Sequence, residues 1–262
     1  MVPFRGYDDG MSQELRRIYP DADALARAAA DDLLRLAHEV VAARGIFTLS
    51  LAGGSTPRKL YSLLASVAAF HDFPWDKTHL FFGDERHVPP THIDSNYLMV
   101  SSTLLASGLV PPANVHRIRA EMPDANVAAV DYDVELHTSF PLESRLNGFP
   151  RFDVILLGMG PDGHTASLFP GSKALEEKER WVVANWVEKF KSARITFTFP
   201  VLNAARNILL LVAGPDKADM LHHVLVAERL REPYPVQLVM PVDGNKIWLL
   251  DHAAAERLPA TT

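Results

Sequence analysis

Apolar residues recur at two different spacings along this chain, and the two spacings alternate. In residues 22–43 they return every three or four positions among aspartates and arginines, which is the spacing of one buried face of a helix. The next segment, residues 46–51, is short and mostly apolar and stops at Gly53-Gly54, as a buried parallel strand does. The sequence therefore predicts a helix, a strand and then a tight turn.

The same alternation continues to the end of the chain. Pro57 suits the first turn of a helix that continues through Leu64. Further strands are predicted at residues 79–82, 152–157, 194–199, 207–212 and 246–250, and further helices at residues 95–106, 125–137 and 216–228. Strands that alternate with helices predict an α/β fold with a parallel sheet covered on both faces. No repeat, low-complexity tract or Gly/Ser linker interrupts the pattern, so we expect residues 1–262 to form a single domain.

Composition narrows the classes of partner and chemistry. Of the 262 residues 48% are hydrophobic, enough for a large core, and the formal net charge of −6 provides no basic field for nucleic acid or an anionic membrane. The absence of cysteine excludes disulfides, thiolate nucleophiles and thiolate metal sites. The N-terminal region has no signal-peptide core, and no stretch reaches the roughly 18 apolar residues of a membrane span, so we expect a cytoplasmic protein.

Three polar, glycine-containing segments directly follow predicted strands, where α/β sheets bind ligands. The first contains Gly53, Gly54, Ser55 and Thr56. Its paired glycines let backbone N–H groups approach an anion, and the following helix adds its positive end. The segment has neither the Walker nor the dinucleotide-binding spacing, so a phosphate cradle and an ordinary turn with a Ser/Thr cap remain equal alternatives.

The second segment begins Gly83-Asp84-Glu85-Arg86-His87 and is followed by Asp94. Arg86 can bind a phosphate or carboxylate with its planar guanidinium, and Asp84 can orient substrate hydroxyls. The alternative is a solvated loop with an internal Asp–Arg pair. We expect Asp94 to be the N-cap of the next helix.

The third segment, residues 158–170, is the most informative. Its three glycines bring Asp162 and His164 together, and an imidazole held by a carboxylate is the usual general base near neutral pH. The alternative is a capping aspartate beside a solvated histidine. Since the chain has neither cysteine nor a G-x-S-x-G elbow, His164 acting on water is favoured over covalent catalysis.

Basic residues near two later strands are candidates for an anion site. Lys217 follows Gly214-Pro215-Asp216 in a predicted first helical turn, where a cation opposes the helix dipole and an anionic ligand would compensate it. Arg194, Lys189 and Lys191 precede a strand. For Lys189 and Lys191, surface charge is the favoured interpretation. The remaining histidines lack metal-ligand spacing, so no metal site is predicted.

Taken in order, these segments resemble the 6-phosphogluconolactonase family. The resemblance runs from Thr48 to about His223 through LSLAGGSTPRKLY, FFGDERHVPPTHIDSNYLM, DVILLGMGPDGHTASLFPGS and RITFTFPVLNAARNILLLVAGPDKADML. It implies a Rossmann-like three-layer sandwich, with a mainly parallel central sheet flanked by helices, related to glucosamine-6-phosphate deaminases and ribose-5-phosphate isomerases. It also implies hydrolysis of 6-phospho-D-glucono-1,5-lactone in the oxidative pentose phosphate pathway, without metal or cofactor.

The resemblance also assigns roles to residues. The general base of the family falls on His164 with Asp162 beside it, and the substrate-binding arginines fall on Arg86 and Arg194. The phosphate loop falls on Gly54, Ser55 and Thr56, and the phosphate-facing lysine falls on Lys217. Ala52 stands where many members carry serine, which removes one hydroxyl contact.

Two other classes of function remain as alternatives. A deaminase or isomerase of the same superfamily would have a similar D-G-H turn, but its members carry tyrosine where Arg86 stands. A sugar-phosphate-sensing effector domain would carry a basic helix-turn-helix, and the acidic first helix here provides none. We therefore expect a small phosphorylated sugar lactone as partner, no nucleic acid or membrane, and a monomer or weak dimer.

Overall fold

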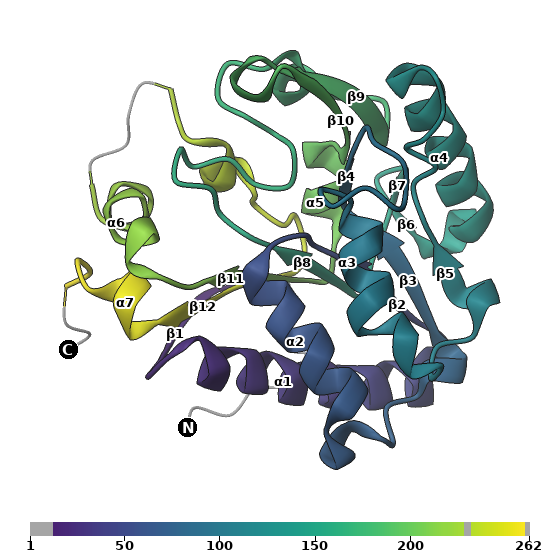
Figure 1. Ribbon diagram of the computed structural model, residues 1–262, viewed down its shortest axis with the longest axis horizontal. Helices are drawn as coiled ribbons and strands as arrows, with labels where there is room; N and C mark the ends of the chain where they lie inside the picture. Colours follow the sequence, from purple (N-terminus) through teal and green to yellow (C-terminus); the bar gives the residue numbers. More distant parts are fainter. Residues whose placement is uncertain (1–12, 228–231, 260–262) are drawn as a thin grey trace.

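The computed structural model describes residues 13–227 and 232–259 and is built around one seven-stranded sheet (Figure 1). The strand order is β1-β12-β11-β8-β2-β3-β5, and every neighbouring pair in this sheet is parallel. The strands are β1 (Gln13–Tyr19), β2 (Phe47–Leu51), β3 (Thr78–Phe82), β5 (Val115–His116), β8 (Val154–Leu157), β11 (Asn207–Val212) and β12 (Asn245–Asp251). The predicted α/β class with a parallel central sheet is confirmed.

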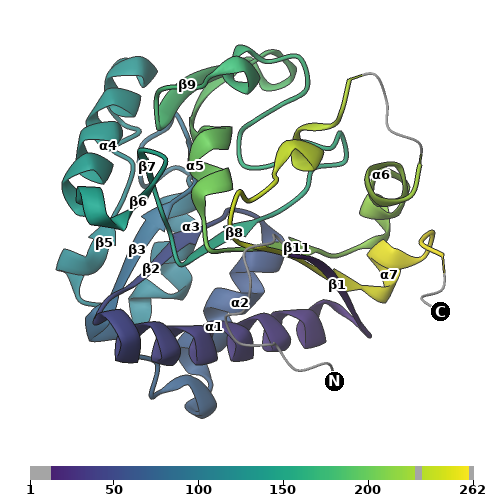
Figure 2. The ribbon, with the colours of Figure 1, turned by 180° about the vertical axis from the view of Figure 1, so that it is seen from behind.

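Helices cover the sheet. They are α1 (Ala22–Arg44), α2 (Ser55–Ser66), α3 (Asn96–Thr103), α4 (Ala125–Ser139), α5 (Phe199–Ala204), α6 (Ala218–Leu225) and α7 (His252–Ala255). Figures 1 and 2 show α1 and α2 on one face of the sheet, with α4 and α5 on the other side. The first helix begins where the Asp21 side chain accepts hydrogen bonds from two backbone N–H groups, and it ends at Gly45, whose φ of 82° lies in the left-handed region.

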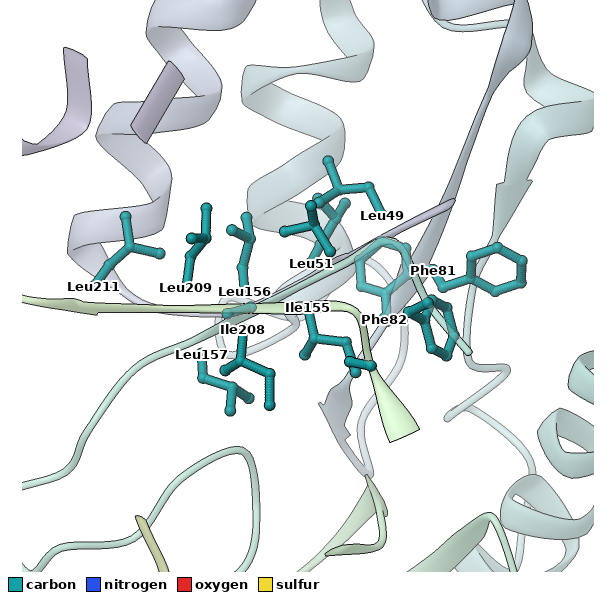
Figure 3. Close-up of a cluster of buried hydrophobic side chains, with 14 of the residues drawn as sticks. Leu49, Leu51, Phe81, Phe82, Ile155, Leu156, Leu157, Ile208, Leu209 and Leu211 are labelled. Atoms are coloured by element: carbon teal, nitrogen blue, oxygen red, sulfur yellow. The ribbon is translucent and has the colours of Figure 1, made fainter. Parts of the chain in front are cut away.

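The central strands are buried on both faces, which explains their continuous apolar sequences. Leu156, Leu209 and Leu211 point to one face of the sheet, whereas Leu157 and Ile208 point to the other (Figure 3). All five side chains are at most 2% exposed. The side chains of such a strand are buried in the core, so functional side chains must come from the loops that follow the strand ends.

One predicted strand belongs to a different sheet. The apolar run near Arg194 is β10 (Ser192–Phe197), which pairs antiparallel with β4 (Asp84–Arg86) and β9 (Val182–Val187). Residues 84–86 were expected to be a loop, and β9 and β1 were not predicted. β9 and β10 form a hairpin, whereas β4 lies about a hundred residues before β10, and a partner so far along the chain leaves no local pattern in the sequence.

Two helix boundaries also differ from expectation. Asp94 is not the N-cap of α3, because Ser95 occupies that position and its Oγ accepts a hydrogen bond from the Leu98 N–H at 3.1 Å. The predicted helix 216–228 is the 3₁₀ turn η8 (Pro215–Lys217) followed by α6, which ends at Leu225. Glu228, the last residue of that predicted helix, lies outside the described residues, as do residues 1–12 of the segment searched for a signal peptide.

Within the described ranges, no helix combines the length and the apolar character needed to cross a bilayer.

A third, smaller sheet is the two-stranded hairpin of β6 (Arg145–Leu146) and β7 (Phe149–Pro150).

We predict that Tyr61→Phe lowers the free energy of unfolding by about 1–3 kcal/mol. The buried Tyr61 hydroxyl accepts a hydrogen bond from the Ala52 N–H and donates one to the Ala52 carbonyl, both at 2.9 Å, and the variant leaves these backbone groups without that partner. Urea denaturation measures the change. Tyr97→Phe, which removes a hydroxyl from a partly buried tyrosine, is the control, and equal losses in both variants would contradict this explanation.

Candidate active site

A cleft of about 240 Å³ opens at the carboxyl edge of the central sheet. It lies where β2 and β8 are neighbours, and the chain leaves these two strands in opposite directions. From β2 the chain passes through α2 to β3 on one side, whereas the next strand of this sheet after β8 is β11 on the other side. Such a switch point is where open α/β sheets bind ligands. The lining comprises residues 51–54, 83–84 and 156–161 together with Arg86, Asn96, His164, Ala166 and Lys217.

The two glycines after β2 permit a close approach that no other residue allows. A Cβ atom on Gly53 would lie 2.0 Å from Asn96 Oδ1, and Gly54 adopts a φ of 107°. Gly54 is the N-cap of α2 and supplies no side-chain hydrogen bond, so the alternative of a turn with a Ser/Thr cap is wrong for this helix start. The N–H groups of the first helical turn and the positive end of the helix dipole therefore remain available beside the cleft.

The family resemblance implied that Ser55 and Thr56 bind phosphate, whereas their position after these glycines left a phosphate cradle and an ordinary turn as equal alternatives. Ser55 and Thr56 are the first two residues of α2, and neither is part of the cleft lining. Any contact that they make with a ligand in the cleft would have to come from its rim.

Asp84 and Glu85 are buried and organise the walls of the cleft. Asp84 Oδ2 accepts a 2.6 Å hydrogen bond from Ser167 Oγ, and its carbonyl accepts one from Asn96 Nδ2 at 3.0 Å. Glu85 accepts bonds from the N–H groups of Arg86, Asn96 and Tyr97 at 2.7, 2.7 and 2.8 Å. Burial raises the pKa of Glu85 above its ordinary value, and these hydrogen bonds offset only part of that increase. The alternative of a solvated loop is therefore wrong for these two residues.

Arg86 and Arg194 lie directly opposite each other on β4 and β10. Like charges in this arrangement destabilise a sheet unless something neutralises them. Burial, and after it the charge of Arg86, lower the pKa of Arg194, and the buried Arg194 Nε has no hydrogen-bond partner among the described residues. The carboxylates of Asp84, Asp94 and Glu85 raise that pKa again and so supply negative charge to the pair. Arg86 lines the cleft, whereas Arg194 is not part of the lining.

The D-G-H turn brings Asp162 and His164 together, as the glycines suggested. Asp162 Oδ1 is hydrogen-bonded to His164 Nδ1, and the imidazole stacks on the Phe169 ring with centroids 4.0 Å apart. Gly160 is required here because its Cβ would lie 2.0 Å from His164 Nδ1. Since Asp162 holds Nδ1 and His164 lines the cleft, Nε2 is the ring nitrogen left for a ligand.

Asp162 is held in its charged form. Burial alone would raise the pKa of Asp162. The hydrogen bond and charge of His164 and the hydrogen bond of Lys189 outweigh burial and lower the pKa to about 2. Lys189 Nζ lies 3.2 Å from Asp162 Oδ2. Surface charge was the favoured interpretation of Lys189. Its side chain is indeed 55% exposed, but its contact with Asp162 was not predicted, because β9 and its turn were not predicted either.

Lys217 is also part of the cleft lining. It ends η8 and is the N-cap of α6, and its side chain is 21% exposed. Its Nζ lies 2.9 Å from Asp216 Oδ2. A lysine at this helix start faces the positive helix end, so an anion in the cleft would stabilise it.

The cleft residues that sequence reasoning missed are Asn96 and Ala166, together with Ser167, which supports Asp84 from outside the lining. Ala166 adopts a φ of 46°, a left-handed conformation that costs free energy in a residue other than glycine. No local pattern in the sequence marks this strain. Within the described residues, no group of three or more His, Asp or Glu side chains is arranged to hold a metal ion.

Comparison with known proteins places the chain in a family. The family model described as glucosamine-6-phosphate isomerases/6-phosphogluconolactonase matches residues 20–248. The chain belongs to this family. A 6-phosphogluconolactonase from Nostoc sp. is 39% identical over 241 residues, which cover 92% of this chain and 97% of that protein. One from Synechocystis sp. is 41% identical over 220 residues, which cover 84% and 88%.

The fold comparison agrees with the family assignment. The structure of a 6-phosphogluconolactonase from Trypanosoma brucei aligns with a TM-score of 0.83 at 28% identity, covering 95% of this chain and 100% of that one. The resemblance stated from the motifs is therefore confirmed at the level of family and fold.

We predict that Asp162→Asn destabilises the protein by about 1–2 kcal/mol near neutral pH. The folded-state pKa of about 2 lies below the ordinary 3.8, so the charged carboxylate stabilises the fold fully above pH 3.8. This contribution is lost as the pH falls from 3.8 toward about 2, so the two proteins converge in acid. Urea denaturation between pH 7 and pH 3 measures the difference.

Asp76→Asn is the control for that comparison, because its carboxylate is 73% exposed and lies 3.8 Å from Lys77 Nζ. We expect it to change stability by less than about 0.5 kcal/mol. A deficit in Asp162→Asn that stays constant down to pH 3 would show that the charge of Asp162 is not what stabilises the turn.

Proposed function

We propose that this protein hydrolyses 6-phospho-D-glucono-1,5-lactone to 6-phospho-D-gluconate. The observation that carries the proposal is the Asp162–His164 pair, which opens on the same cleft as Lys217 and the start of α2. The relatives named 6-phosphogluconolactonase support it, because they match over most of their own length. A base and an anion site in one cleft suit a phosphorylated ester.

The phosphate binds at the end of the cleft formed by Gly54 and Lys217. The first-turn N–H groups of α2 and the Lys217 ammonium supply hydrogen-bond donors and positive charge. Arg194 and Ser55-Thr56 extend this site at its rim. Arg86 lines the cleft together with His164, and Asp84, held by Asn96 and Ser167, faces the sugar hydroxyls.

Water is the nucleophile in the reaction that we propose. His164 Nε2 takes a proton from water as its oxygen attacks the lactone carbonyl, and it returns that proton to the ring oxygen when the C–O bond breaks. Asp162 holds the imidazole through Nδ1 and balances its positive charge. Arg86 or a backbone amide of the loop stabilises the developing oxyanion. A δ-lactone is an activated ester, so nitrogen and oxygen groups of the chain suffice and no metal or cofactor is assigned a role.

The wider context follows the same proposal. We place the enzyme in the oxidative pentose phosphate pathway of the cytoplasm, as a single domain that acts as a monomer or weak dimer. The assay that tests the activity follows lactone hydrolysis above the spontaneous rate, beside ammonia release from glucosamine 6-phosphate. Turnover of the amino sugar with none of the lactone would overturn the proposal in favour of a deaminase.

We predict that His164→Ala lowers kcat by about 10²–10⁴-fold while the protein stays folded and still binds 6-phosphogluconate. The reason is that the variant removes the base and leaves Lys217 and the start of α2 in place. The measurements are hydrolysis rate and product affinity by calorimetry. His87→Gln is the control, because His87 Nε2 is hydrogen-bonded to the Met122 carbonyl at 2.7 Å and does not line the cleft.

Two results would contradict the role of His164. Near-normal turnover in His164→Ala would make the histidine dispensable, and an equal loss of binding and turnover would make it a binding residue. In either case the base would have to be sought among Asp84, Glu85 and His87.

We predict that Lys217→Ala raises KM for the lactone about tenfold or more with a smaller effect on kcat, since its charge contacts the phosphate in the ground state and the transition state alike. Steady-state kinetics separate the two constants. Lys77→Ala is the control for the loss of a lysine, because the Lys77 side chain is 55% exposed and does not line the cleft. An unchanged KM in Lys217→Ala would show that the phosphate does not bind beside Lys217.

A further inference from the structure

The turn between β9 and β10 lies against the D-G-H turn, and the proposed mechanism has not used it. This turn comprises η7 (Glu188–Phe190) and Lys191, which adopts a left-handed φ of 48°. Two of its side chains are about half exposed, Lys189 at 55% and Phe190 at 47%. Exposed lysines and aromatics normally gain little from a fixed position, so their contacts here call for a physical reason.

Lys189 binds the second oxygen of the Asp162 carboxylate. Its Nζ lies 3.2 Å from Oδ2, while Oδ1 is hydrogen-bonded to His164 Nδ1. A carboxylate held at both oxygens cannot rotate away from the imidazole. The position of Lys189 therefore bears directly on the orientation of His164.

Phe190 is linked to the same histidine through Phe169. Its ring meets the edge of Phe169 at 5.8 Å and 76°, and Phe169 in turn stacks on His164 at 4.0 Å. The Lys189 ammonium lies 5.5 Å from the Phe190 ring, and the Arg194 guanidinium lies 5.3 Å from it. The contacts thus form a closed ring through Asp162, His164, Phe169, Phe190 and Lys189, with Arg194 attached.

We propose that Lys189 and Phe190 are positioning residues for the lactone hydrolysis described above, on which this inference rests. Lys189 fixes the carboxylate of Asp162, which holds the His164 imidazole at Nδ1, and it places a positive charge beside this pair. Phe190 holds Phe169 against the imidazole and carries the Arg194 guanidinium on its face.

Other charged and titratable groups surround His164, and a pH effect must be separated from theirs. Asp84, Arg86 and Lys217 line the same cleft, Asp216 pairs with Lys217, and Tyr234 packs against Gly163. None of these groups changes when Lys189 is replaced, so a shift specific to Lys189 variants isolates its contribution.

The experiment compares the pH dependence of kcat/KM in wild type, Lys189→Met, Lys189→Arg and Lys191→Met. We expect the acid limb of the profile to move to higher pH by about 0.2–0.7 unit in Lys189→Met, because removing the cation favours the protonated imidazole. Lys189→Arg restores the wild-type limb. Lys191→Met is the matched control, since Lys191 lies in the same turn but pairs with Glu188.

A direct titration separates failure of this inference from failure of the proposed function. The imidazole signals of His164, assigned with a His164→Gln variant, are followed by NMR across pH in the absence of substrate. The titration midpoint in Lys189→Met is expected to rise by the same amount, whatever the protein hydrolyses. A midpoint and an acid limb that match wild type, or that move equally in Lys191→Met, would overturn the role of Lys189.

The role of Phe190 is tested by Phe190→Leu against Trp186→Leu. Trp186 is an exposed aromatic residue on the neighbouring β9, where its Nε1 donates to Glu188 Oε2 at 2.8 Å. We expect Phe190→Leu to lower kcat/KM two- to fivefold, the equivalent of one lost cation–π contact, and Phe190→Tyr to restore it. Equal effects of the two leucine substitutions would overturn this part of the proposal.

Discussion

The parallel pairing of β2 with β8 is the constraint on which the rest of the structure depends. These strands are neighbours in the sheet, yet the chain leaves their carboxyl ends in opposite directions, toward β3 and toward β11. No crossover covers the gap between them, and the loops after both strands are free to carry polar groups. The cleft, its helix terminus and the D-G-H turn all lie at this gap.

Glycine and buried polar groups turn that gap into a defined site. A side chain on Gly53 or Gly160 would lie 2.0 Å from Asn96 or His164, so the walls approach each other as closely as backbone allows. Asp84 then links the wall after β3 to Ser167 in the loop after β8. Buried hydrogen bonds of this kind are costly to break, so they hold the site in a single arrangement. In this arrangement the imidazole of His164 lines the cleft.

Local sequence pattern predicted the parts of this arrangement that depend on local chemistry. The helix at residues 22–43, the strands at residues 46–51 and 207–212, and the proximity of Asp162 to His164 follow from residue spacing alone. The pairing of β4 with β10 was missed because the two strands lie more than a hundred residues apart, and no nearby residue indicates that pairing. For the same reason the sequence did not reveal that Arg86 lies opposite Arg194, or that Lys189 reaches Asp162.

A structure of the protein with 6-phosphogluconate bound tests the central claim most directly, namely that one cleft holds both the phosphate and the reacting carbonyl. The account predicts the phosphate within hydrogen-bond distance of Lys217 and the first turn of α2, and the carboxylate of the product beside His164 Nε2. A product bound outside this cleft, or bound in it with its phosphate against His164, would contradict the account.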